Sequence, residues 1–221
     1  MTAILFGSIS TLADTSELQR RAFNEAFEAH GLDWQWSRDD YSSMLGSNGG
    51  ANRIDDYATS RGDDVDAAAV HATKSQIFQE LLGATSIEPR PGVAATVEAA
   101  KKHGVKLAFV TTTSPENVAA LLAALQPALG AQPFDLIVDS TSVDQPKPDP
   151  AAYAYALNQL GEQADGVVAI EDNVGGVSAA AAAGVACVAF PNANTAGGDF
   201  SAADETVDSL DAEQILKHVA S

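Results

Sequence analysis

Short apolar runs alternate with longer helical patterns over the second half of the chain, and this alternation most constrains its fold. The apolar runs cover residues 106–110, 134–138, 167–170 and 185–190, and helical patterns of about ten residues or more separate them. Strands that alternate with helices in this way form right-handed βαβ units, whose sheet is parallel and covered on both faces. Residues 3–7 form one further apolar run, which we expect to join this sheet. The sequence therefore predicts an α/β protein with a doubly wound parallel sheet.

A helical segment interrupts this pattern between the first strand and the rest of the sheet. Residues 15–82 contain no persuasive strand, whereas residues 16–30 and 66–82 carry apolar side chains at helical spacing. Residues 47–50 form a predicted turn, because adjacent glycines tolerate positive φ angles. We therefore expect an all-helical insert that covers part of the sheet.

The boundaries of this insert follow from the loop signals around it. Residues 83–92 contain two glycines and two prolines, which favour a loop that returns the chain to the first domain. We accordingly predict an α/β core made of residues 1–14 and 90–221, and a helical cap made of residues 15–89.

Composition excludes several classes of partner. Thirty acidic residues against twelve lysines and arginines give a formal net charge of −18. Such a charge disfavours binding to nucleic acid and to anionic membrane surfaces. The N-terminal apolar run is too short for a signal peptide or a membrane span, and the single cysteine, Cys187, lies in an apolar run that predicts a buried thiol. We expect a cytoplasmic protein.

Polar side chains follow the predicted strands at the points where these end. Thr111, Thr112 and Ser114 come after one strand, and Glu171 and Asp172 come at the end of another. The carboxyl ends of parallel strands form the edge where open α/β sheets bind ligands. The hydroxyl groups are suited to hold an anion or to cap the next helix. The two acids are suited to bind Mg²⁺ weakly or to cap the helix that follows them.

Four stretches at these strand ends resemble the motifs of the haloacid dehalogenase (HAD) superfamily, in the right order and spacing. They are residues 3–15, with the frame of Phe-Asp-x-Asp-Gly-Thr-Leu, then Val110-Thr111-Thr112-Thr113-Ser114, Pro146-Lys147-Pro148-Asp149 and Ile170-Glu171-Asp172-Asn173-x-x-Gly176. The resemblance implies a Rossmann-like HAD core with an inserted all-helical cap of the C1 type. In this family the second motif holds the phosphoryl group, and the acidic pair of the fourth anchors Mg²⁺.

The cap sequence resembles one subgroup of this superfamily. Residues 14–25, 31–34 and 49–54 look like the CbbY-type sugar-phosphate phosphatases, whose relatives include β-phosphoglucomutase and phosphoglycolate phosphatase. The resemblance implies a small phosphorylated metabolite as the ligand.

Three positions depart from the catalytic pattern of this family. Gly7 stands where the family has its nucleophilic aspartate, and Ile9 where it has its acid/base aspartate. Gln145 stands at the lysine of Lys-Pro-x-Pro-Asp, and Lys147 falls on the variable position. Glycine and isoleucine supply neither a nucleophile nor a proton donor. Ser8 and Ser10 are the nucleophile-capable side chains of this loop, but we interpret them as hydrogen-bonding residues because using them breaks the register of the motif.

Three hypotheses follow for function. The first is a HAD-like phosphatase homologue that has lost hydrolytic activity and serves in phosphate-ligand binding or regulation. The second is an active hydrolase that acts on a small phosphate ester with a rearranged site. The third is a structural partner of an active paralogue.

Overall fold

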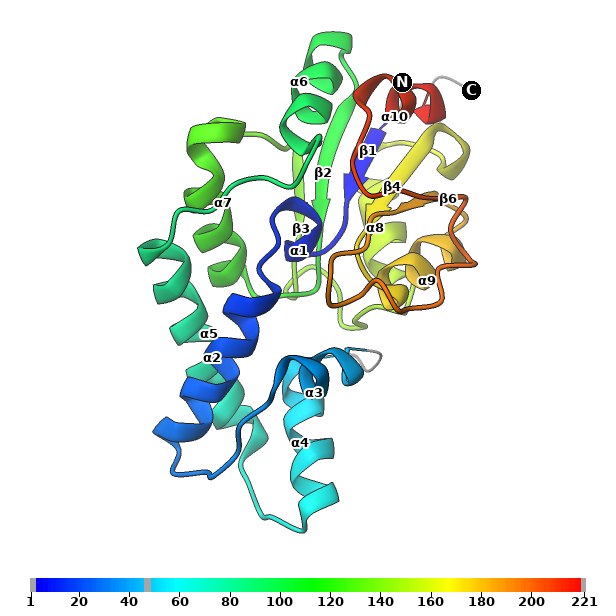
Figure 1. Ribbon diagram of the computed structural model, residues 1–221. Coiled ribbons are helices and arrows are strands. Elements are labelled where there is room, and N and C mark those ends of the chain that lie inside the picture. The colour runs from blue at the N-terminus through cyan, green and yellow to red at the C-terminus, as the bar shows by residue number, and fades with distance from the viewer. Residues whose placement is uncertain (1–2, 46–48, 220–221) are drawn as a thin grey trace.

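The computed structural model describes residues 3–45 and 49–219 (Figure 1). Residues 47 and 48 of the predicted turn lie outside the described residues. Among the helices that the structure describes, none is both long and apolar enough to cross a membrane.

Six parallel strands form one sheet in the order β3-β2-β1-β4-β5-β6. The strands are β1 (Ala3–Phe6), β2 (Lys106–Val110), β3 (Leu136–Val138), β4 (Val167–Glu171), β5 (Ala186–Ala189) and β6 (Glu205–Thr206). β1 lies at the centre, and Phe6 is in register with Phe109 of β2 and Ile170 of β4. The loops that follow these three strands therefore begin side by side at the same edge of the sheet. The predicted parallel α/β fold is confirmed.

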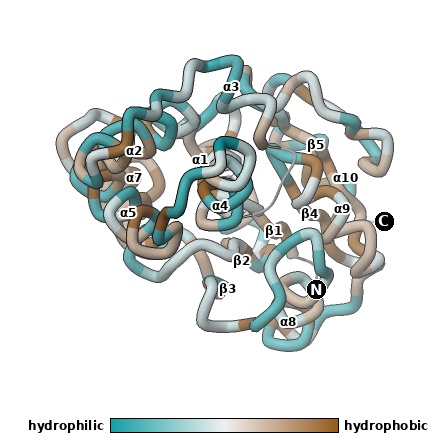
Figure 2. Tube along the Cα trace, turned by 90° about the horizontal axis from the view of Figure 1, so that it is seen from below, coloured by the Kyte–Doolittle hydropathy of each residue, from teal (hydrophilic) through white to brown (hydrophobic). Residues whose placement is uncertain are grey.

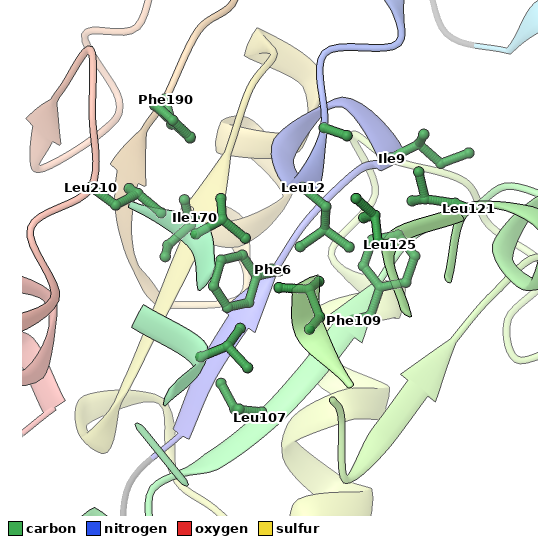
Figure 3. Packing of buried hydrophobic residues seen from close by; sticks show 14 of the residues in the cluster. Phe6, Ile9, Leu12, Leu107, Phe109, Leu121, Leu125, Ile170, Phe190 and Leu210 are labelled. Atoms are coloured by element: carbon green, nitrogen blue, oxygen red, sulfur yellow. The ribbon is translucent and has the colours of Figure 1, made fainter. Parts of the chain in front are cut away.

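Helices cover both faces of the sheet. Side chains alternate along β1, so that Ile4 and Phe6 point to one face while Ala3 and Leu5 point to the other. The first face packs against α6 (Val93–His103), α7 (Pro115–Leu129) and α10 (Ala212–Val219), as Figure 3 shows in part. The second face packs against α8 (Ala151–Leu160) and α9 (Val174–Ala182). Two apolar cores thus hold the central strand and fix the start of the loop after it.

Four helices lie beyond the carboxyl end of the sheet, at the bottom of Figure 1. They are α2 (Ser16–Ala29), α3 (Arg38–Ser43), α4 (Gly50–Arg61) and α5 (Ala67–Ala84). Their own core is aromatic, and Trp34 and Trp36 are buried in it, next to Phe23 and Phe27. α5 packs against both α2 and α7, and Figure 2 shows these three helices together. α5 therefore connects the helical region to the core, while the exact domain boundaries stay a prediction.

Two short elements complete the chain. The single turn α1 (Ile9–Leu12) follows β1 directly, and the 3₁₀ turn η1 (Ala164–Gly166) precedes β4. α1 carries the side chain of Ile9 into the apolar core, so this turn decides which residues of the loop face the sheet edge.

Candidate functional site

A cleft of about 460 Å³ separates the carboxyl edge of the sheet from the helical region. Its core wall comes from the loops after β1, β2, β3, β4 and β5, and its cap wall comes from α2, α3, α4 and α5. The core wall includes Ser8, Thr111, Thr112, Ser114, Lys147, Asp172 and Asn192, and the cap wall includes Gln19, Gly50, Arg53, His71 and Lys74. The predicted phosphate-binding hydroxyls, Asp172 of the predicted metal pair and a set of cap cations thus share one cleft.

The two positions that correspond to the family's aspartates offer no reactive group. Gly7 directly follows β1, and its N–H donates to the carbonyl of Ile170 at 2.8 Å. Ile9 is 5% exposed and belongs to the apolar cluster that contains Leu121 and Leu125 (Figure 3). Neither side chain supplies a nucleophile or a titratable proton to the cleft.

The carboxyl group of Glu171 fills the space above Gly7. A Cβ atom added to Gly7 would lie 2.1 Å from the Cδ atom of Glu171, and a Cβ atom added to Gly176 would also lie 2.1 Å from it. The carboxyl group is therefore enclosed between two glycines whose missing side chains make room for it. Glu171 is 0% exposed, and its Oε2 atom is buried without a hydrogen-bond partner.

Lys147 holds this carboxylate from the other side. Its Nζ atom donates to Oε1 of Glu171 at 2.6 Å, to the carbonyl of Val110 at 2.6 Å and to the hydroxyl of Tyr153 at 3.3 Å. The Tyr153 hydroxyl in turn donates to the same Oε1 atom at 2.6 Å. An ammonium group has three N–H donors, so these contacts use all of them. Burial raises the pKa of Glu171, and the neighbouring ammonium acts in the opposite direction.

This arrangement corrects the sequence prediction for the lysine. Gln145, which we placed at the family's lysine position, is exposed at the surface. Lys147, which we placed on a variable position, is 7% exposed and brings the ammonium group to the sheet edge. The sheet edge therefore has a lysine cation, and this lysine lies two residues later in the chain than we predicted.

Asp172 is the carboxylate that does line the cleft, and its oxygens are already hydrogen-bonded. Oδ1 accepts from the Ser8 hydroxyl, from Thr11 Oγ1 at 3.2 Å and from Asn173 Nδ2 at 3.2 Å. Oδ2 accepts from Asn192 Nδ2 at 3.1 Å. Ser8 therefore acts as a hydrogen-bond donor, in line with the interpretation made from the sequence.

Only one member of the acidic pair predicted to bind Mg²⁺ lines the cleft. Glu171 is enclosed and paired with Lys147, whereas Asp172 faces the cleft with both oxygens accepting hydrogen bonds. Mg²⁺ usually binds one or two carboxylates and keeps several waters, so weak binding at Asp172 stays a prediction. Within the described ranges, no group of three or more His, Cys, Asp or Glu side chains could hold a metal ion.

The predicted phosphate-binding hydroxyls have local roles as well. Thr111 Oγ1 accepts from the N–H of Thr113 at 3.3 Å, and Ser114 Oγ caps α7 by accepting from the N–H of Asn117 at 3.4 Å. Thr112 is half-buried in the cleft wall. Ser114 thus caps a helix, which is one of the two roles we predicted for these hydroxyl groups. An anion-binding role for the three hydroxyls stays a prediction.

Sequence reasoning missed a cluster of cations on the cap wall. Arg53 of α4 is 8% exposed and Lys74 of α5 is 4% exposed. Lys74 Nζ donates to Gln19 Oε1 at 3.1 Å and lies 4.7 Å from the ring centroid of Phe23. Burial, together with the charge of Arg53, lowers the pKa of Lys74 to about 7. Burial and these two cations lower the pKa of His71 to about 4, so that this ring is neutral at pH 7.

One signal for this cluster was present in the sequence. Lys74 lies four residues after Val70 and four before Phe78, on the apolar side of the predicted helix. A lysine is almost never fully buried unless it has a partner or a function.

The fold and the site together define the class of protein. The family model of the haloacid dehalogenase-like hydrolases matches residues 1–184, and the chain belongs to this family. The resemblance seen in the motifs at the strand ends is thereby confirmed.

Individual relatives show which subgroup of this family the chain resembles most clearly in sequence and structure. Protein CbbY of Rhodobacter capsulatus is 39% identical over 215 residues, which cover 96% of this chain and 95% of that protein. A crystal structure of CbbY from Rhodobacter sphaeroides in complex with phosphate has a TM-score of 0.90 and 38% identity over 100% of both chains. A mutant of that protein in complex with xylulose-(1,5)bisphosphate has a TM-score of 0.87 and 39% identity over 95% of each chain. The chain is a homologue of CbbY-like sugar-phosphate phosphatases.

Proposed function

We propose that this protein binds a small phosphorylated metabolite in the cleft and does not hydrolyse it. The observation that carries this proposal is the enclosure of Glu171 between Gly7 and Gly176. No side chain stands at the nucleophile position, and the carboxylate that fills the space is 0% exposed. It cannot approach a phosphorus atom in the cleft without leaving its partners.

Hydrolysis through a covalent intermediate needs groups that this cleft lacks. A carboxylate must attack phosphorus, and an acid must protonate the departing alkoxide. Gly7 and Ile9 supply neither group, and Lys147 is engaged by Glu171. In an enzyme whose catalytic groups act as a unit, loss of the nucleophile alone lowers turnover on the order of 10⁶-fold (the subtilisin value, applied by analogy).

The choice of a phosphorylated ligand rests on the cap wall and on the relatives. Arg53 and Lys74 place two buried basic side chains in the cleft, where low dielectric strengthens the attraction for an anion. Structures of CbbY contain phosphate and xylulose-(1,5)bisphosphate. The two basic side chains in the cleft favour a ligand of this class.

A second candidate function is hydrolysis through Ser8, with Asp172 as its base. The hydrogen bond from the Ser8 hydroxyl to Asp172 favours it. Three further donors, Thr11, Asn173 and Asn192, accompany Ser8 on this carboxylate. Both oxygens of Asp172 are therefore engaged as hydrogen-bond acceptors, and we place this candidate second.

The experiment that separates these functions measures binding and turnover on the same samples. A panel of sugar phosphates is incubated with the protein and Mg²⁺, inorganic phosphate is quantified, and the melting temperature is recorded for each ligand. We expect stabilisation by at least one ligand with phosphate release equal to the protein-free blank. Release that depends on Mg²⁺ and disappears in Ser8→Ala would favour the hydrolase. The absence of both release and stabilisation would contradict the binding proposal and favour a structural partner.

A further inference from the structure

The cleft wall that follows β2 depends on one buried side chain of α7. Asn117 is 5% exposed and lines the cleft in the first turn of this helix. Its backbone is fixed there, because its N–H donates to the capping hydroxyl of Ser114 at 3.4 Å. Its side chain donates from Nδ2 to the Oγ1 atom of Thr113 at 3.1 Å. A buried amide needs partners at both ends, so the amide oxygen of Asn117 requires a donor as well.

The cap supplies this donor from α5. Gln79 donates from Nε2 to the Oδ1 atom of Asn117 at 3.0 Å. Gln79 itself lies outside the cleft, on a separate cavity of about 550 Å³ between α5 and α7. The side chains of Gln79, Asn117 and Thr113 thus form one chain of hydrogen bonds that runs from the cap helix to the cleft.

The direction of this chain decides what the Thr113 hydroxyl offers to the cleft. Thr113 accepts from Asn117, so its own O–H remains available as a donor, and no group of the described residues accepts that proton. Thr113 lines the cleft, where the proton can be donated to a ligand. If the amide of Asn117 were turned over, its oxygen would accept the Thr113 proton and only hydroxyl lone pairs would face the cleft. An anion is bound by the first arrangement and repelled by the second.

We infer that Gln79 is a positioning residue for the cleft, because its donation to Asn117 orients that amide so that the Thr113 hydroxyl presents its proton to the ligand. This inference rests on the proposed function, and it assigns to a cap residue control over the core wall. A donor at residue 79 favours the observed direction of the chain. An acceptor at this position reverses the direction, and an apolar side chain favours neither direction.

Titration calorimetry at pH 8 in EDTA, with xylulose 5-phosphate as the probe, tests this role. Gln79→Glu places an acceptor beside Asn117 and should weaken binding about five-fold, the usual effect of one hydrogen bond. Gln79→Met removes the donor at a similar side-chain length and should weaken binding about two-fold. Gln76→Met is the matched control, since Gln76 is an exposed glutamine of the same helix that donates to Glu80, and it should leave binding unchanged. Melting temperatures verify that each variant is folded.

The Thr113→Val background separates this role from the charge that Gln79→Glu adds. Valine keeps the shape of threonine and has no hydroxyl group to orient. In this background we expect Gln79→Glu to change binding by less than about two-fold, because the two substitutions remove the same interaction. Simple charge repulsion would persist without the hydroxyl. Gln79→Met enters the same cycle, so the test does not depend on the folding of one variant.

The outcomes separate the inference from the proposal on which it rests. If Gln79→Glu and Gln79→Met bind the probe as tightly as wild-type protein does, the inference is wrong and the binding function stands. The same holds if Gln79→Glu weakens binding equally with and without the Thr113 hydroxyl. If wild-type protein binds neither xylulose 5-phosphate nor inorganic phosphate, both the inference and the proposed function are wrong.

Discussion

Restoring an aspartate at the nucleophile position should destabilise this protein and should not make it a phosphatase. The change Gly7→Asp introduces a Cβ atom 2.1 Å from Cδ of Glu171, well inside the closest approach of real atoms. Gly7 has no positive φ angle, so the backbone accepts a side chain there, and the three atoms nearest to the added Cβ all belong to Glu171. The Glu171 side chain must leave its enclosure to make room.

The cost follows from the contacts that Glu171 makes. Leaving the enclosure breaks the buried ion pair with Lys147 and the hydrogen bond from Tyr153. Breaking a buried ion pair costs about 3–5 kcal/mol, and we expect a loss of this size in the free energy of unfolding. Glu171→Ala should cost a similar amount, because it leaves the ammonium of Lys147 buried without a counter-charge.

The double variant distinguishes this explanation from a general loss of packing. In Gly7→Asp/Glu171→Ala the introduced carboxylate takes the place of Glu171 beside Lys147. We therefore expect it to be more stable than either single variant in urea unfolding. Additive losses in the double variant would refute this explanation.

Two further glycines serve as controls that test whether the steric conflict with Glu171 causes the loss of stability. Gly176→Ala meets the same Cδ atom at 2.1 Å and should also be destabilising, with most of the loss removed by Glu171→Ala. Gly83 lies within α5 with no atom within 4 Å of an added Cβ, so Gly83→Ala should leave stability unchanged or raise it by up to about 1 kcal/mol.

Further predictions concern stability. Burial lowers the folded-state pKa of Lys74 from 10.5 to about 7, so between pH 7 and 9 the unfolded chain binds the proton more strongly than the folded one. Stability should rise by about 2 kcal/mol over these two pH units, and Lys74→Met should remove this rise in urea unfolding at both pH values. Arg90→Met leaves the carbonyls of Phe190 and Pro191 without their donors and should cost about 3 kcal/mol in the same assay, and an unchanged unfolding midpoint would contradict that role. Asp66 caps α5 by accepting from the N–H of Ala69 at 3.0 Å; Asp66→Ala should cost about 1 kcal/mol, and Asp66→Asn much less.

The strands of the sheet were predictable because a buried parallel strand appears in the sequence as a continuous apolar run. The helices between them were predictable because their apolar residues recur at helical spacing. β1, β2 and β4 appeared within a residue or two of their observed bounds, as did the helix from Ser16 to Ala29. β6 is two residues long and has no run to recognise, and α1 is one turn whose apolar residues continue from the strand before it. Short elements of this kind depend on tertiary packing, which the local sequence does not reveal.

The candidate site was predictable only where a strand positions it. Glu171 and Asp172 lie at the sheet edge as expected, since Glu171 ends β4 and Asp172 follows it. The lysine was placed wrongly because Pro146, Lys147 and Pro148 fit the motif pattern in more than one register, and burial decides which side chain reaches the edge. The enclosure of Glu171 depends on two glycines that are far apart in the chain and meet only in the folded protein.

The central claim is that the cleft holds a phosphorylated ligand without breaking its phosphate ester. Phosphorus NMR tests it most directly, because one spectrum reports both the bound ester and any free phosphate. The measurement follows xylulose 5-phosphate with the protein and Mg²⁺ over one day, beside a protein-free control. We predict a broadened or shifted ester resonance and no inorganic phosphate above the control. A growing inorganic phosphate resonance that requires the folded protein would contradict the claim.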